Sequence, residues 1–203
     1  MTSGQRVALA LGGGGARGYA HIGVIRELEE RGHEIVAVAG TSMGAVIGGL
    51  YCAGTLDPYT EWVIGLTQRD VIRLLDPSIK APGLIKAEKV MSRVRELLAG
   101  KRIEDLPIPF TAVATDLIAQ KEAWFQDGPV EAIAVSLTGP RIEPTSLPAG
   151  RAAAAPEDSA AQIPLGLRTL DLHRASELIE LGRQHTRNVL DRETDGSSSR
   201  ATG

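Results

Sequence analysis

The feature that most constrains the fold is a pair of short apolar runs, each followed by glycine and then by a helical pattern. Residues 7–11 (Val-Ala-Leu-Ala-Leu) lead into four glycines, and residues 35–39 (Ile-Val-Ala-Val-Ala) lead into Gly40. Such continuous runs are typical of strands buried on both faces. The segments that follow, 19–31 and 42–53, have helical spacing or composition. This order predicts an α/β fold with a mainly parallel sheet and helices on both faces.

The remaining segments continue this pattern and lengthen the sheet. Periodicity and turn residues predict a helix and an amphipathic stretch in 57–75, a loop at 77–84, a helix at 86–98, strands at 110–114, 121–125 and 133–137, and a last helix at 171–190. With 203 residues and 43% hydrophobic content, the chain is large enough for a real core. Because aromatic residues make up only 3%, that core must rest on Val, Leu, Ile and Ala.

Composition divides the chain into four segments. The α/β core is predicted at 6–139. Five prolines and a run of alanines indicate a linker at 140–165. A C-terminal helical segment is predicted at 166–192, and the small polar residues of 193–203 predict a disordered tail.

Charge, hydropathy and cysteine content exclude several classes of protein. A net charge of −3 gives no electrostatic case for binding nucleic acid. The apolar runs are too short to span a bilayer, and the N-terminus lacks the long apolar region of a signal peptide. The single cysteine, Cys52, excludes an internal disulfide and a multi-cysteine metal site, and we expect a buried structural thiol. These features predict a cytoplasmic protein and leave peripheral membrane contact open.

The first chemical signal is residues 40–44, Gly-Thr-Ser-Met-Gly, between the second predicted strand and its helix. The pattern Gly-x-Ser-x-Gly in this context places a serine on a tight turn with its hydroxyl accessible. The positive end of the following helix favours negative charge that develops beside it. We therefore predict Ser42 as an acyl-transfer nucleophile. The alternative is that Ser42 only caps a buried helix.

The second signal is the glycine-rich loop at residues 12–18, Gly-Gly-Gly-Gly-Ala-Arg-Gly. Glycine permits positive φ, so such a loop can direct several backbone N–H groups at one oxygen. Residues 13–18 also fit Gly-x-Gly-x-x-Gly, so dinucleotide binding is an alternative. That fingerprint expects an acidic residue near the end of the second strand, where this chain has Val-Ala-Val-Ala at 36–39. The Gly-Lys-Ser or Gly-Lys-Thr of a phosphate-binding loop is absent.

Both signals lie at the carboxyl ends of neighbouring predicted strands. Open α/β sheets form their ligand crevice at this edge. A nucleophile beside several amide donors is the minimum equipment for acyl transfer. The sequence thus predicts an acyl-transfer site there.

The two signals together resemble the patatin-like phospholipase family, of the bacterial or neuropathy-target-esterase type. The resemblance covers roughly residues 6–131. It is carried by 13–18 (Gly-Gly-Gly-Ala-Arg-Gly), 19–24 (Tyr-Ala-His-Ile-Gly-Val), 40–45 (Gly-Thr-Ser-Met-Gly-Ala), 109–110 (Pro-Phe) and 114–117 (Ala-Thr-Asp-Leu). It implies a three-layer α/β/α fold and a Ser-Asp dyad that hydrolyses lipid or carboxylic esters without metal or cofactor.

The resemblance also implies roles for individual residues. Ser42 would attack the ester carbonyl. The amides of the loop around Gly13, Gly14 and Gly15 would hold the oxyanion, and Arg17 would support that loop. A local ion pair is the equal alternative for Arg17.

The chain departs from the family pattern at the second catalytic group. The family carries its aspartate in Asp-Gly-Gly or Asp-Gly-Ala, and this chain has neither tripeptide. It has Asp-Gly-Pro at 127–129 and Asp-Gly-Ser at 195–197, the latter in the predicted tail. We infer an internal loss between Glu131 and Ala132, so the fold is truncated or internally deleted. Asp127 is the remaining candidate for a substitute base.

Other residues carry weaker alternatives. A triad through His173 or His185 is possible in chain order, although the spacing gives it no support. Asp116 is expected to fix a turn after its strand. The apolar stretch 71–75 could line an acyl-chain entrance or touch a membrane, but core packing is favoured. A non-catalytic lipid- or protein-binding remnant of the fold is the main alternative function.

Overall fold

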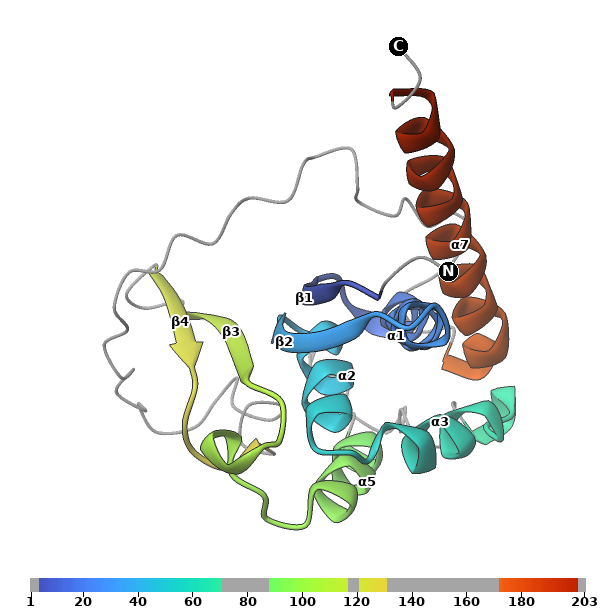
Figure 1. The fold of residues 1–203 in the computed structure, drawn as a ribbon. Coiled ribbons are helices and arrows are strands. Elements are labelled where there is room, and N and C mark those ends of the chain that lie inside the picture. Colours follow the sequence, from blue (N-terminus) through green and yellow to red (C-terminus); the bar gives the residue numbers. More distant parts are fainter. Residues whose placement is uncertain (1–3, 71–87, 117–120, 131–171, 201–203) are drawn as a thin grey trace.

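The computed structural model describes residues 4–70, 88–116, 121–130 and 172–200. The elements are β1 (Arg6–Leu11), η1 (Gly15–Tyr19), α1 (Ala20–Glu30), β2 (Glu34–Gly40), α2 (Met43–Cys52), α3 (Leu56–Ile64), α5 (Glu88–Leu98), η2 (Ile103–Asp105), β3 (Phe110–Asp116), β4 (Lys121–Phe125), η4 (Leu172–Arg174) and α7 (Ala175–Arg200). They confirm the predicted helices and strands that fall within these residues (Figure 1). The predicted strand at 133–137, the stretch 71–75, the loop at 77–84 and the linker lie outside the described residues.

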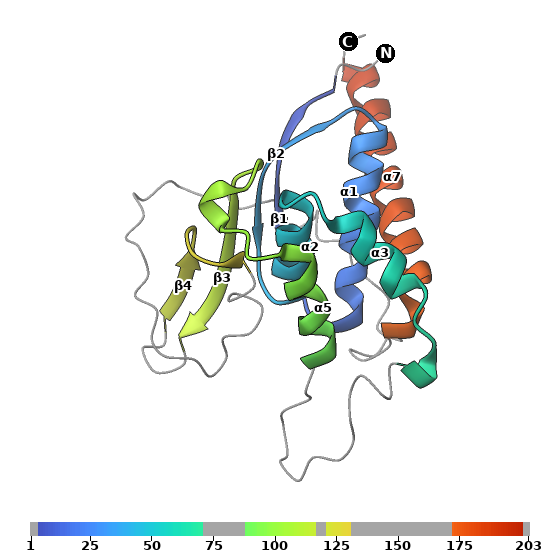
Figure 2. The same ribbon diagram turned by 90° about the horizontal axis from the view of Figure 1, so that it is seen from below.

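The strands form one open sheet in the order β1-β2-β3-β4. The first three strands are parallel and β4 is antiparallel to β3. This confirms the mixed α/β fold with a mainly parallel sheet. Both crossovers, β1 to β2 and β2 to β3, move in the same direction along the sheet. Right-handed connections then place α1 and α2 on the same face, and α2 contacts all three parallel strands (Figure 2).

The two faces of the sheet therefore differ in burial. Leu11, Val38 and Phe110 are buried beneath the helices. Ala8 and Ala10 of β1 point away from them and are exposed. The prediction that residues 7–11 form a strand buried on both faces is wrong, because β1 lies at the edge of the described sheet and the described helices gather on the opposite face (Figure 2). A further helical layer on the exposed face stays a prediction.

Helix α7 packs along α1 and belongs to the same hydrophobic core (Figures 1 and 2). Two glycines allow the close approach. A Cβ on Gly23 would lie 1.9 Å from the carbonyl oxygen of Ile179, and one on Gly182 would lie 2.0 Å from that of Ala20. The predicted C-terminal helical segment is therefore an integral part of the core.

The far end of α7 differs from the sequence prediction. The helix continues past residue 192 to Arg200, so the predicted start of disorder at 193 is corrected. No proline interrupts this stretch. Once a helix exists, each added residue gains a hydrogen bond without a new nucleus, so it propagates even through small polar residues.

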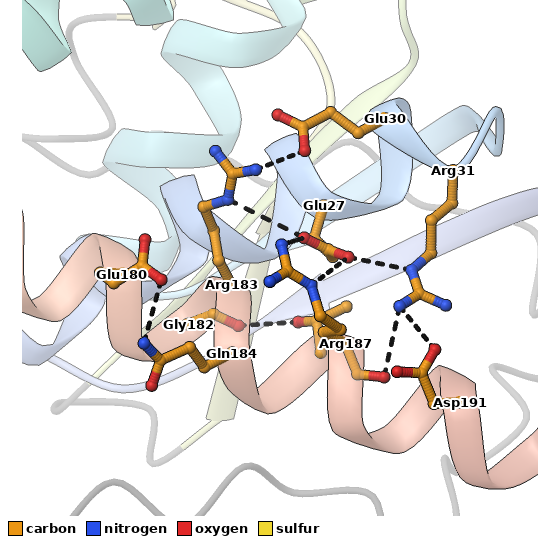
Figure 3. A network of polar contacts seen from close by, with 10 residues as sticks. Glu27, Glu30, Arg31, Glu180, Gly182, Arg183, Gln184, Arg187 and Asp191 are labelled. Atoms are coloured by element: carbon orange, nitrogen blue, oxygen red, sulfur yellow. Dashed lines mark hydrogen bonds and ion pairs between the residues drawn. The ribbon is translucent and has the colours of Figure 1, made fainter.

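The polar part of the α1–α7 contact centres on Glu27, whose side chain is only 4% exposed. Arg31, Arg183 and Arg187 surround it (Figure 3). Arg31 donates to Glu27 at 2.9 Å, Arg187 donates at 2.9 and 3.2 Å, and Arg183 lies at 3.8 Å. Asp191 pairs with Arg31 at 2.7 Å, which extends the network along α7. The buried carboxylate is thus fully paired, as its burial requires.

None of the described helices is both long and apolar enough to cross a membrane.

Candidate active site

The elbow between β2 and α2 holds Ser42 in a conformation that few L-residues adopt. Its φ is 54° and its ψ is −129°. The amide of Thr41 donates to the carbonyl of Leu11 at 3.0 Å, and Ala45 donates back to Ser42 at 3.0 Å. These bonds fix the turn from both sides. Backbone strain that its surroundings maintain in this way is typical of functional sites.

The side chain of Ser42 does not cap α2. It makes no capping hydrogen bond and Ser42 is exposed at the surface. A capping serine would accept from a backbone N–H in the first turn of the helix. The capping alternative therefore has no support, and the hydroxyl is accessible to a substrate.

The packing around the elbow leaves no room for a side chain at either of its glycines. A Cβ on Gly40 would lie 2.6 Å from the carbonyl oxygen of Gly44. A Cβ on Gly44 would lie 2.1 Å from the carbonyl oxygen of Leu11. Gly18 of the glycine-rich loop is similarly constrained, because its Cβ would lie 2.2 Å from Cγ of Met43. The elbow thus meets the end of β1 at backbone distance, and the glycine-rich loop packs against the side chain of Met43.

The glycine-rich loop lies directly beside the hydroxyl of Ser42. An ideal Cβ on Gly14 would be 3.0 Å from its Oγ. Gly13 and Gly15 have positive φ values of 77° and 64°, which favour glycine. The amides of Gly13 and Gly14 make no hydrogen bond within the described part of the chain. The structure thus brings the predicted loop and Ser42 together and leaves N–H groups beside them available.

His21, near the start of α1, makes a contact that the sequence reasoning missed. Its Nε2 lies 2.6 Å from the carbonyl oxygen of Gly12. Since a carbonyl only accepts, Nε2 must carry a hydrogen. Burial lowers the pKa of His21, and the bond to Gly12 partly opposes this shift. The available signal was its position just after the loop, within the matching segment 19–24, where a turn of chain can bring it back.

Arg17 lies in η1 and is half-buried. Its side chain makes no hydrogen bond or ion pair with the residues that the structure describes. The alternative of a local ion pair therefore finds no partner there. Support of the oxyanion loop by Arg17 stays a prediction.

Asp127 lies at the opposite end of the strands from Ser42, too far to assist it. Gly40 pairs with Ala112, which pairs with Phe125. Because β4 runs antiparallel, Asp127 lies beyond this level toward the start of β3, while Ser42 lies beyond it in the other direction. The offset is roughly 13 Å along the strands and about 10 Å across two strand spacings.

Local hydrogen bonds hold the turn around Asp127 in place. Gly128 accepts from Ile103 at 2.9 Å, and its amide donates to Glu104 at 2.9 Å. Both partners belong to η2, which precedes β3. Direct or one-water contact between Asp127 and Ser42 is therefore excluded in this arrangement.

The remaining candidates are one cysteine, one aspartate and two histidines. Cys52 is buried, and burial raises the pKa of its thiol to about 12, which confirms the predicted structural thiol. Asp116 is the last residue of β3. His173 lies in η4 and His185 on α7, and neither bonds to Ser42. Among the described residues no group of His, Cys, Asp and Glu could hold a metal ion.

Comparison with known proteins identifies the class that this fold and site define. The family model of the patatin-like phospholipases matches residues 9–165. The chain therefore belongs to the patatin-like phospholipase family. The match extends past residue 131, the end of the resemblance described in the sequence analysis.

Individual relatives agree with this assignment. An uncharacterized NTE family protein of Mycobacterium tuberculosis is 60% identical over 131 residues, which cover 64% of this chain and 36% of the relative. Its Mycobacterium bovis counterpart matches equally well. Patatin-like phospholipase domain-containing protein 6 of Mus musculus is 36% identical over 134 residues, covering 63% of this chain and 10% of that protein. The chain thus spans about a third of the length of its mycobacterial relatives.

Proposed function

We propose that this chain is a serine acyl hydrolase for lipid or carboxylic esters, with Ser42 as its nucleophile and turnover limited by a missing base. One observation carries the proposal: Gly14, between two glycines of positive φ, lies against Oγ of the strained Ser42. A nucleophile and amide donors at this separation can act on the same carbonyl group. The family assignment supports lipid acyl hydrolysis as the reaction class.

The reaction would follow the usual course of acyl transfer. Oγ of Ser42 attacks the ester carbonyl and forms a new C–O bond, while the carbonyl oxygen gains negative charge. Amides of Gly13 and Gly14 would donate to that oxygen, and the N-terminus of α2 would add its positive dipole end. Collapse of the intermediate breaks the ester C–O bond, and the alcohol leaves with the proton that Ser42 lost. Water then hydrolyses the acyl-serine to the free acid and regenerates the hydroxyl of Ser42. The proposed site needs no cofactor or metal.

The step that this chain serves poorly is removal of the serine proton. The family's Asp-Gly-Gly or Asp-Gly-Ala is absent, and Asp127 lies too far from Ser42 to replace it. General base catalysis typically contributes about 10²–10⁴-fold. We therefore expect slow turnover, supported by the oxyanion hole and substrate binding alone.

The test separates a reactive serine from an inert one. The protein is incubated with a fluorophosphonate probe and, separately, with p-nitrophenyl butyrate. Ser42→Ala should abolish labelling and ester cleavage, whereas Ser92→Ala, at an exposed position on α5, should change neither. Equal behaviour of wild type and Ser42→Ala would refute the nucleophile.

The missing base favours one alternative, a non-catalytic remnant that binds lipid or protein. It predicts a cooperative melting transition and binding to lipid vesicles without labelling or ester cleavage. Vesicle binding by the wild type would also support the proposed peripheral membrane contact of an otherwise cytoplasmic protein. Dinucleotide binding, the third hypothesis, predicts a saturable titration with NAD or FAD.

A further inference from the structure

We propose that His21 is a positioning residue for this reaction: it holds the carbonyl of Gly12 and thereby fixes the direction of the neighbouring oxyanion-hole amide. This inference rests on the proposed function of the glycine-rich loop. The observation behind it is the 2.6 Å contact between Nε2 of His21 and the Gly12 oxygen.

The geometry of the peptide bond connects this contact to the site. The carbonyl of Gly12 and the N–H of Gly13 belong to one planar trans peptide, so they point in opposite directions. A hydrogen bond that holds the carbonyl on the side of α1 therefore directs the N–H of Gly13 to the other side. Gly13 precedes Gly14, whose Cβ position is 3.0 Å from Oγ of Ser42. His21 thus restrains the amide of the residue before Gly14 without touching the substrate.

Among the described residues, the space where a side chain would stand on either side of this peptide is open. A Cβ built on Gly12 or Gly13 would meet no atom within 4 Å. Both flanking residues are glycines, which rotate easily between positive and negative φ. Without the bond from His21, rotation of this peptide would carry the N–H of Gly13 away from its direction. Gly14 and Gly18 differ, because neighbouring atoms already occupy the space beside them.

The imidazole is suited to this task in one defined tautomer. Its partner is a carbonyl oxygen, so the hydrogen of the neutral ring must be on Nε2. Burial lowers the pKa of His21, which keeps the ring neutral near neutral pH. The ring therefore acts as a fixed donor.

The experiment compares His21→Ala, His21→Gln and His33→Ala. Glutamine can present an amide N–H to Gly12 in place of the imidazole. His33 also bonds to the backbone, because it accepts from the amide of Gln5 at 3.2 Å, but it lies at the opposite end of α1 and serves as the matched control. The rate of fluorophosphonate labelling at Ser42 is measured together with the melting temperature.

We expect His21→Ala to slow labelling by about 10–100-fold, somewhat less than complete loss of an oxyanion-hole donor. His21→Gln should recover a large part of the rate, and His33→Ala should label as the wild type does. A wild-type rate in His21→Ala would overturn the proposal. The proposal would also be overturned if the fall in labelling rate only matched the fraction of unfolded protein and His21→Gln did not restore the rate.

A second measurement tests His21 if even the wild type is not labelled, which is the failure of the proposed function. In ¹H–¹⁵N NMR the ring of His21 should be the Nε2-protonated tautomer, and the Gly13 amide signal should shift in His21→Ala but not in His33→Ala. An Nδ1-protonated ring or an unchanged Gly13 signal would overturn the positioning role.

Discussion

Glycine brings two pairs of backbones into contact in this molecule, with opposite consequences. At the elbow, a Cβ on Gly44 would lie 2.1 Å from the carbonyl oxygen of Leu11. At the α1–α7 crossing, Cβ atoms on Gly23 and Gly182 would lie 1.9 and 2.0 Å from carbonyl oxygens. The steric demand is the same. The elbow leaves a strained, exposed Ser42, whereas the crossing surrounds a fully paired carboxylate.

The difference shows that close packing alone does not mark a functional site. The crossing satisfies its polar groups, with Arg31 and Arg187 bonded to Glu27. The elbow region keeps the amides of Gly13 and Gly14 unbonded within the described part of the chain. Unsatisfied donors beside a strained, exposed serine are typical of a functional site, and satisfied polar groups are typical of structural packing. Substitutions in the two regions should therefore separate reactivity from stability.

The largest effect is expected for Gly44→Ala. Its new methyl group would overlap the backbone of Leu11, which cannot move without displacing β1. We expect a loss of about 3 kcal/mol in the free energy of unfolding and loss of fluorophosphonate labelling. Urea denaturation and labelling measure the two.

The control for this prediction lies on the same helix. In Gly49→Ala the nearest atom is Cγ1 of Val130 at 3.2 Å, a flexible side chain. That substitution should change stability by less than about 1 kcal/mol, because helix propensity offsets the tight contact. Equal losses of stability in Gly44→Ala and Gly49→Ala would show that the elbow does not require glycine at position 44.

Gly182→Ala should destabilise the α1–α7 crossing without abolishing the labelling of Ser42. A methyl group there would meet the carbonyl of Ala20 at 2.0 Å and push α7 away from α1. We expect a loss of about 2 kcal/mol, since alanine favours the helix itself. Labelling of the folded fraction at Ser42 should persist. Labelling lost as completely as in Gly44→Ala would contradict the separation of the two regions.

Glu27→Gln tests the paired carboxylate at the crossing and its dependence on pH. The hydrogen bond from Arg187 is the main reason that the pKa of Glu27 lies below its usual 4.5. Its contribution to stability is therefore present above that value and is lost as pH falls through the lower, folded-state pKa. We expect Glu27→Gln to be about 1.5 kcal/mol less stable at pH 7, because the arginines are partly exposed.

Urea titrations of wild type and Glu27→Gln between pH 7 and pH 3 measure this difference. The two stability curves should converge toward low pH. Glu29→Gln is the matched control on the same helix, because Glu29 accepts from Tyr51 at an exposed site and its side chain makes no hydrogen bond or ion pair with the described part of α7. A constant gap between Glu27→Gln and wild type across this pH range would exclude the ionised carboxylate as the cause.

The sequence predicted the elbow more completely than the crossing, for a physical reason. Strand, glycine and helix follow one another at residues 35–53, so a local pattern specifies both the turn and Ser42. The contacts between Gly23 and Ile179 and between Glu27 and Arg187 join residues more than 150 positions apart. No periodic pattern in the sequence predicts contacts between residues so far apart. The bond from His21 to Gly12 was not predicted, because it depends on the path that the loop takes between them.

The smallest effect, and the sharpest test of strain at the elbow, is expected for Ser42→Gly. The φ of 54° and ψ of −129° are accessible to glycine but unfavourable for serine. Relief of strain should exceed the extra entropy of glycine in the unfolded chain and raise stability by about 1 kcal/mol, while labelling disappears.

Ala99→Gly provides the comparison, because Ala99 also has positive φ, 47°, but follows α5 far from the chemistry. It should gain a similar amount by removing the penalty of a Cβ in the left-handed region, with labelling unchanged. A Ser42→Gly variant that is less stable than the wild type, beside an Ala99→Gly variant that is more stable, would show that the elbow is not strained. Favourable contacts would then hold the exposed serine in place, and backbone strain could no longer be used as an argument that Ser42 is reactive.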